Sequence, residues 1–196
     1  TDEHHDVERS ILAELSAKFS VDDLRLACNH ALSIPIASAQ VVDDTVQALL
    51  LLGEANYSVK FDPSSTMSER VLFPSAPSQS NGIEDARFVH FRHDDGSTVY
   101  FATFTAYNGR SAVPQLMETH DFVRIHFVSM SGNAIMNKGM ALFPRKIKGK
   151  YWTLSRQDDV NVMIMASDSL LHWNDPEVVL APESPWEMFK MGNCDS

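Results

Sequence analysis

The fold is decided by the stretch R-F-V-H-F-R-H-D-D-G-S-T-V-Y-F-A-T-F-T-A, from Arg87 to Ala106. Two runs rich in aromatic and β-branched residues flank Asp94-Asp95-Gly96, and a polar, glycine-containing tripeptide between such runs is typical of a hairpin turn. A second stretch, from Ala141 to Arg156, has the same form with its turn at Lys148-Gly149-Lys150. We therefore predict two antiparallel hairpins.

Each predicted hairpin leads into two further strand-like runs that are separated by a turn of small residues. Equivalent positions of the two units lie roughly 50 residues apart, which is the period of propeller blades with four strands each. A plain β meander with regular hairpins would give the same pattern. At this period residues 56–196 form an incomplete β-propeller of about two and a half blades. We expect a fragment of a longer protein whose exposed edge strands offer a route to homo-oligomers.

Residues 1–55 have a different character and are predicted to form an N-terminal helical segment. Apolar side chains recur at helical spacing from about Val7 to Gly53. The whole chain is thus expected to be mainly β with a helical appendage. We expect a capping box at Ser20 and Asp23 to begin the second helix and Asp43 or Asp44 to cap the third. Gly53 is the expected helix stop.

The composition excludes several classes of partner. The chain is 44% hydrophobic and 21% charged, which are globular values, and its formal net charge of -10 disfavours nucleic acid and anionic membrane surfaces. No apolar run approaches the ~18 residues of a membrane span and no signal peptide is visible, so we expect a cytoplasmic protein. No metal site is predicted. Cys28 and Cys194 lack the spacing of a metal site, and a strand would place His90 and His93 on opposite faces.

Residues suited to catalysis are concentrated in N-G-I-E-D-A-R, from Asn81 to Arg87. A carboxylic acid beside a cation at the start of a strand is suited to general acid catalysis on a sugar. If the segment is extended, Asp85 and Arg87 share one face while Glu84 points to the other, so that only one of the two acids serves the site directly. The alternative is that Glu84 and Arg87 form a surface ion pair at the strand entrance.

Six motifs follow one another along the chain: G-I-E-D-A-R (Gly82–Arg87), T-A-Y-N-G (Thr105–Gly109), N-K-G-M-A-L-F-P-R-K-I-K-G-K-Y (Asn137–Tyr151), L-S-R-Q-D (Leu154–Asp158), S-D-S-L-L-H-W (Ser167–Trp173) and W-E-M-F-K-M-G-N (Trp186–Asn193). Their order resembles glycoside hydrolase family 130. That family comprises β-mannoside phosphorylases and related mannosidases on a five-bladed β-propeller. The resemblance covers roughly residues 57–196, and six motifs in order are far more specific than any one of them.

The resemblance implies roles for particular residues. The Asp of the family's E-D-P-R motif is its general acid and falls on Asp85, with Glu84 and Arg87 in support. The sequence departs from the family pattern at two positions. Ala86 replaces the usual proline, which loosens the backbone beside the acid. Asn108 replaces the Asp of the family's T-A-Y-D-G motif, which removes a charge but keeps hydrogen bonding. Substrate binding would fall on Tyr107, Asn108, Asn137, Lys138, Arg156 and Asp158.

The activity that the resemblance implies is inverting phosphorolysis or hydrolysis of β-mannosides. In a phosphorylase the nucleophile is inorganic phosphate, a co-substrate that needs cations and no further cofactor. Lys138, Arg145 and Arg156 are the candidate cations, with Arg156 favoured because its bidentate geometry suits phosphate. In a hydrolase a second carboxylate, Asp158 or Asp159, would activate water.

Two other functions remain open at the level of sequence. One is a noncatalytic carbohydrate-binding or interaction module on a propeller scaffold, and the other is an unrelated β meander with a helical arm that binds a partner. For the enzyme, we expect the 196-residue chain alone to be inactive, because a propeller site is assembled from all the blades.

Overall fold

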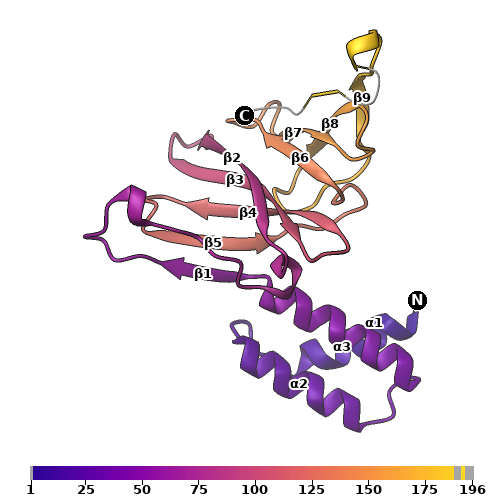
Figure 1. The fold of residues 1–196 in the computed structure, drawn as a ribbon. Helices are drawn as coiled ribbons and strands as arrows, with labels where there is room; N and C mark the ends of the chain where they lie inside the picture. The colour runs from indigo at the N-terminus through magenta and orange to yellow at the C-terminus, as the bar shows by residue number, and fades with distance from the viewer. Residues whose placement is uncertain (1, 188–190, 193–196) are drawn as a thin grey trace. The chain divides into compact units, whose positions relative to one another are not determined.

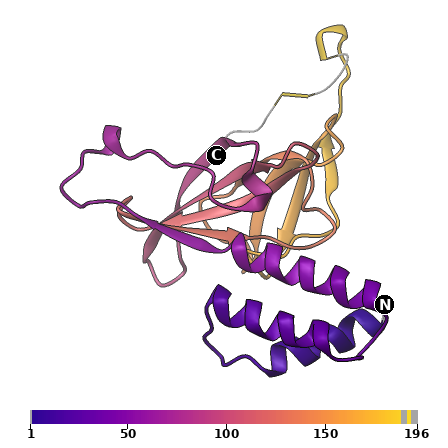
Figure 2. The same ribbon diagram turned by 60° about the horizontal axis from the view of Figure 1, so that its bottom comes forward.

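The computed structural model describes residues 2–187 and 191–192, so that Cys194 and part of the Trp186–Asn193 motif lie outside the described residues. It divides into two compact units, Thr1–Ala55 and Asn56–Ser196. The first consists of helices and the second of two sheets (Figures 1 and 2), so the expectation of a mainly β chain with helices is confirmed. Within the described ranges no helix is long and apolar enough to cross a membrane.

Three helices form the first unit. Their apolar stripes face one another around a core in which Val7 and Ile11 are completely buried. The helices are α1 (Asp2–Ala13), α2 (Val21–Ser33) and α3 (Ala39–Glu54).

The start of α2 confirms the predicted capping box. The Ser20 hydroxyl accepts from the Asp23 N–H at 3.2 Å, and the Asp23 carboxylate accepts from the Ser20 N–H at 2.8 Å. Two helix-end amides that lack a partner in the helix are satisfied in this way. Hydrogen bonds from Ser20 hold the pKa of the Asp23 carboxyl below its usual value.

The predicted limits of α3 are wrong. The N-cap is Ser38, whose hydroxyl accepts from the backbone N–H three residues further on at 3.4 Å, while Asp43 and Asp44 lie inside the helix. Gly53 also lies inside α3, which ends one residue later. A Cβ on this glycine would lie 2.7 Å from Leu24 Cδ2, so the glycine serves the close approach of α2 and α3 and does not end the helix.

Two antiparallel sheets form the second unit (Figure 1). The first is a meander from β2 to β5 that β1 extends beside β5, and the second is a meander from β6 to β9. Short 3-10 turns interrupt the connections at Met67–Glu69 and Pro77–Gln79 and follow the last strand at Pro185–Glu187. The strands are β1 (Tyr57–Lys60), β2 (Ile83–Arg92), β3 (Thr98–Tyr107), β4 (Ala112–Thr119), β5 (Arg124–Ser129), β6 (Lys138–Leu142), β7 (Tyr151–Arg156), β8 (Val162–Ser167) and β9 (Glu177–Leu180).

The two meanders repeat each other along the chain. Strands β2 to β5 start at residues 83, 98, 112 and 124, and strands β6 to β9 start at 138, 151, 162 and 177. The offsets of 50 to 55 residues agree with the spacing of the predicted hairpins. Within the described residues the two sheets do not close into a ring, so the five-bladed propeller remains a prediction.

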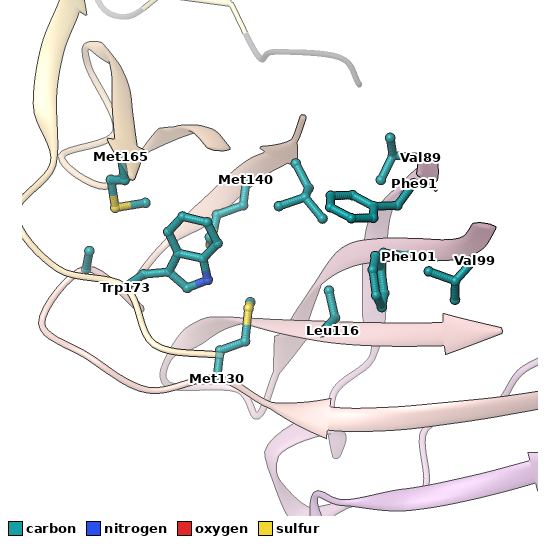
Figure 3. Close-up of a cluster of buried hydrophobic side chains, with 11 residues drawn as sticks. Val89, Phe91, Val99, Phe101, Leu116, Met130, Met140, Met165 and Trp173 are labelled. Atoms are coloured by element: carbon teal, nitrogen blue, oxygen red, sulfur yellow. The ribbon is translucent and has the colours of Figure 1, made fainter. Parts of the chain in front are cut away.

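A shared apolar core holds the two sheets together. Figure 3 shows the indole of Trp173 among the side chains of Met130, Met140 and Met165, with the aromatic side chains of the first sheet beyond them. Methionine fits irregular gaps around an aromatic ring well, and Trp173 is only 1% exposed. A buried hydrogen bond also joins the sheets, from Thr103 Oγ1 to the Met140 carbonyl at 2.6 Å.

The connection between the sheets depends on Gly132. Its φ of +113° is a conformation that residues with a Cβ rarely adopt. A Cβ at this position would lie 2.0 Å from the Trp173 carbonyl oxygen. The two backbones are held close together, because the Trp173 N–H donates to the carbonyl of the neighbouring Ser131 at 2.9 Å. Glycine therefore lets the chain pass directly over the backbone of the core tryptophan.

We predict that Gly132→Ala lowers the free energy of unfolding of the second unit by about 3 kcal/mol, because strain at positive φ and an overpacked contact add. Gly149→Ala is the matched control. Gly149 also has a positive φ, +78°, but a Cβ there meets nothing within 4 Å, so this change should cost only about 1 kcal/mol. Urea unfolding followed by tryptophan fluorescence measures both. Equal losses in the two variants would contradict the packing role of Gly132.

Candidate active site

Strand β2, the first strand of the first meander, contains a β-bulge at the candidate acid. Glu84 pairs with Thr105 and Arg87 pairs with Thr103, so three steps along β2 are matched by two steps along β3. Asp85 lies inside this bulge with φ +56°. Left-handed backbone conformations of this kind are strained for residues other than glycine, and Asp and Asn tolerate them best.

The bulge reverses the alternation of side chains along β2. Ile83 packs with Phe104 in the apolar cluster on one face of the sheet, whereas Val89 and Phe91 belong to the cluster between the sheets. Strict alternation would place these three odd-numbered residues of β2 on one face. The prediction that Asp85 and Arg87 share a face because the segment is regularly extended is therefore wrong, since the bulge between Glu84 and Arg87 interrupts the regular alternation.

The second sheet has the same bulge at the equivalent place. Lys138 pairs with Arg156 and Ala141 pairs with Leu154, again three steps against two. The residue equivalent to Asp85 is Gly139, with φ +92°. Asp85 thus occupies a left-handed position at which the other copy of the repeat has glycine, the residue best suited to that backbone conformation. Strain of this kind, retained at a polar residue, is common at functional sites.

The two bulges bring three charged side chains together. Lys138 Nζ lies 3.2 Å from Glu84 Oε1 and 3.9 Å from Asp85 Oδ2. The expectation that adjacent acids on a strand must diverge is therefore wrong here, because both reach one ammonium group. All three side chains remain open to solvent, with exposed fractions of 35% for Lys138, 52% for Glu84 and 41% for Asp85. A bound ligand can thus reach them.

A hollow of about 270 Å³ adjoins the two acids. Glu84, Asp85 and Ala86 form one side of it, and apolar side chains form the rest. A mainly apolar hollow with a few polar groups at its rim is the usual form of a small-molecule site. The apolar lining consists of Leu72, Ile83, Phe88, Phe104 and Met117.

Arg156 lies beside Lys138 in the register, but its guanidinium is largely committed to the protein. Its side chain is only 7% exposed, Nη1 donates to the Met191 carbonyl at 2.9 Å and Nη2 lies 3.2 Å from Asp159 Oδ1. Its Nε is buried with no hydrogen-bond partner among the described residues. The bidentate edge that would suit phosphate is not freely available in this arrangement.

Asn108 and Asp158 occupy equivalent turns, which follow β3 and β7, the second strand of each meander. Asn108 Oδ1 accepts from the N–H groups of Arg110 and Ser111 at 3.0 and 2.9 Å. Asp158 Oδ1 accepts from the N–H groups two and three residues further on at 2.9 and 2.8 Å. Both side chains therefore cap the turns that follow them.

The other predicted residues lie at the same end of the two sheets. The Tyr107 N–H donates to the Gly82 carbonyl at 3.0 Å, which places this exposed tyrosine beside the start of β2. Asn137 precedes β6 with φ +62°, and its Nδ2 donates to the Gln157 carbonyl at 3.3 Å. The starts of β2 and β6, and the ends of β3 and β7 with the segments that follow them, thus hold the predicted acid and substrate-binding residues. Arg145, the remaining candidate cation, lies elsewhere, because it follows the other end of β6 and forms a β-bridge with Arg92 at the end of β2.

The pairing of Glu84 with Lys138 is the feature that sequence reasoning missed. The two residues hold equivalent positions in the repeat, one directly before each bulge, and they carry opposite charges. Aligning the two repeats in sequence by their hairpin turns places G-I-E-D beside the N-K-G segment, and this alignment would have indicated that Glu84 and Lys138 are equivalent. Any structural prediction of their contact also requires that β2 and β6 be neighbours, which they are.

The glycoside hydrolase family 130 model, described as beta-1,4-mannooligosaccharide phosphorylase, matches residues 42–193. The chain belongs to glycoside hydrolase family 130, and the resemblance drawn from the six motifs is confirmed.

Two curated relatives are similar to this chain. Beta-1,2-mannobiose phosphorylase of Listeria innocua serovar 6a is 32% identical over 118 residues, covering 56% of this chain and 31% of the relative. The 1,2-beta-oligomannan phosphorylase of Thermoanaerobacter sp. strain X514 is 28% identical over 155 residues, covering 72% and 47%. The matched part of the chain thus spans less than half of the length of these relatives. A solved complex of the Listeria innocua enzyme with beta-1,2-mannobiose superposes with a TM-score of 0.49 at 28% identity, covering 58% of this chain and 32% of that one.

The turn cap at Asp158 makes a pH-dependent contribution to stability. Burial raises the pKa of Asp158, but hydrogen bonds from Asn161 and Val160 outweigh this and hold the pKa below its usual value. A carboxyl whose pKa is lower in the folded state stabilises the protein above its unfolded pKa, about 3.9, and loses that contribution as the pH falls through the folded pKa. Asn108 demonstrates that an amide can cap the same turn.

We therefore predict that Asp158→Asn lowers the free energy of unfolding by less than about 1 kcal/mol at neutral pH, because the side chain is exposed and the amide keeps one acceptor. The difference from the wild type should shrink as the pH is lowered towards 3. Urea unfolding at a series of pH values measures it. The control is Asp94→Asn in an exposed turn, and a difference that grows in acid would contradict the prediction.

Proposed function

We propose that the whole protein containing this chain cleaves β-mannosides by phosphorolysis, with Asp85 as general acid. The observation that carries the proposal is the meeting of Asp85, Glu84 and Lys138 beside a hollow at one end of the two sheets. The family and the two phosphorylase relatives support the same activity. The second unit is then part of a five-bladed propeller, and its open edges β1 and β9 are covered by further strands or by another copy.

In this proposal Asp85 donates a proton to the glycosidic oxygen as the bond to the mannose anomeric carbon breaks. Phosphate attacks that carbon from the opposite face, which inverts its configuration. An attacking anion needs positive charge along its approach and no catalytic base, so a second carboxylate is not required. The chemistry needs no further cofactor.

Lys138 is the better candidate for the phosphate cation than Arg156. Its ammonium is partly exposed, and among the described residues its ion-pair partners are two carboxylates at the surface. The Arg156 guanidinium is instead buried against Asp159 and the Met191 carbonyl. A phosphate dianion can replace Asp85 as a partner of Lys138 at little cost. This exchange leaves Asp85 free to hold the proton that it transfers.

Glu84 acts in this scheme as a tether. Its contact with Lys138 at 3.2 Å is closer than that of Asp85, so it keeps the ammonium at the junction of β2 and β6 when phosphate draws it away from the acid. The noncatalytic carbohydrate-binding module remains the alternative. It would be supported if the whole protein binds β-mannosides but consumes neither phosphate nor water.

We predict that Asp85→Asn in the whole protein keeps the fold, because asparagine tolerates the left-handed conformation of the bulge. It should lower turnover of unactivated β-mannosides by about 100-fold or more, because the leaving oxygen then lacks its proton donor. Aryl mannosides with good leaving groups should lose less. Initial rates of phosphate consumption measure both classes of substrate.

The matched control is Glu84→Gln, which changes the neighbouring acid in the same bulge. It should raise the KM for phosphate while the ratio of rates on activated and unactivated substrates stays as in the wild type. Near-normal turnover of unactivated substrates by Asp85→Asn would contradict the assignment, as would leaving-group dependence in Glu84→Gln.

A further inference from the structure

We propose that Asn108 is a site of spontaneous deamidation that the fold itself promotes. The chain contains two Asn-Gly pairs, Asn81-Gly82 and Asn108-Gly109, both with an exposed asparagine. Asn-Gly is the dipeptide in which the following backbone nitrogen is least hindered. The structure treats the two pairs very differently, and this difference assigns the reaction to Asn108.

The reaction is an intramolecular acyl transfer followed by hydrolysis. The Gly109 backbone nitrogen attacks Asn108 Cγ, a C–N bond forms, and the side-chain nitrogen leaves as ammonia after taking up the proton of the Gly109 amide. Water then opens the cyclic imide at one of its two carbonyls. The products are aspartate or isoaspartate at position 108, and the sum is one water consumed and one ammonia released.

The attacking nitrogen is free in one pair and engaged in the other. The Gly82 N–H donates to the Gln79 carbonyl at 2.8 Å, so this bond must break before the nitrogen can attack. No atom of the described residues accepts a hydrogen bond from the Gly109 N–H. Folding therefore protects Asn81 and leaves Asn108 open to attack.

The attacked carbonyl is also activated at Asn108. Its Oδ1 accepts from the Arg110 N–H at 3.0 Å, the Ser111 N–H at 2.9 Å and the Ser111 hydroxyl at 3.3 Å. These donors converge on the oxygen that becomes negatively charged when Cγ is attacked, which is the arrangement of an oxyanion hole. They also hold the Asn108 side chain against the turn that contains Gly109, which limits the orientations of Cγ. The described residues offer Asn81 Oδ1 no such donor.

The fold accepts the aspartate product. The equivalent turn of the second sheet carries Asp158, whose carboxylate accepts hydrogen bonds from the backbone N–H groups two and three residues further on, as Asn108 Oδ1 does in its own turn. Conversion of Asn108 thus makes the two turns chemically alike and adds one negative charge at the end of β3. Any effect of that charge on sugar binding rests on the proposed function, but the deamidation does not.

The test compares the rates at the two asparagines in one molecule. The 196-residue chain is incubated at neutral pH and physiological temperature, once folded and once in concentrated urea, and peptide mapping by mass spectrometry follows both sites. We expect folding to slow Asn81 at least about tenfold relative to its rate in urea, while Asn108 reacts as fast folded as unfolded, or faster. Protection of Asn108 equal to that of Asn81 would overturn the proposal.

Two variants separate activation from simple exposure. Ser111→Ala removes the hydroxyl donor to Asn108 Oδ1 and should slow the folded-state reaction at Asn108 about twofold to fivefold without changing the rate in urea. Asn108→Asp should unfold at the same urea concentration as the wild type, because the Asp158 turn already has that form. An unchanged folded-state rate in Ser111→Ala refutes the oxyanion role. Loss of the fold in Asn108→Asp refutes the claim that the turn accepts the product.

Discussion

The β-bulge in β2 is the constraint on which the candidate site depends. Without the extra residue between Glu84 and Arg87, the strand could not place Ile83 in the cluster on one face of the sheet and Val89 in the core between the sheets. The same residue is the one held in a left-handed conformation, Asp85. Packing on both faces of the sheet therefore keeps the strained acid in place, which is how a strained functional residue is maintained.

The repeat separates residues that serve the fold from residues that serve chemistry. Where the two copies have the same function, they use interchangeable groups, as Asn108 and Asp158 do in capping their turns. Where they differ in charge at equivalent positions, as Glu84 and Lys138 do, the difference creates a contact between the sheets. A comparison of the two copies is thus more informative than either motif alone.

The arrangement of elements could be predicted from the sequence because it depends on local patterns. Alternating apolar residues and the turns at Asp94-Asp95-Gly96 and Lys148-Gly149-Lys150 indicated the hairpins, and Ser20 with Asp23 indicated the start of α2. The bulge could not be predicted, because no local signal distinguishes Glu-Asp-Ala-Arg in a bulge from the same residues in a regular strand. The contacts of Lys138 and the burial of Arg156 depend on neighbours distant in sequence, which patterns of residue type do not specify.

A crystal structure of the whole protein with a β-mannoside and phosphate bound tests the central claim most directly. We predict that the Asp85 carboxyl lies within hydrogen-bonding distance of the glycosidic oxygen, with the left-handed bulge intact and phosphate in contact with Lys138 Nζ. A complex in which another carboxyl reaches the glycosidic oxygen while Asp85 remains paired with Lys138 away from the sugar would contradict it.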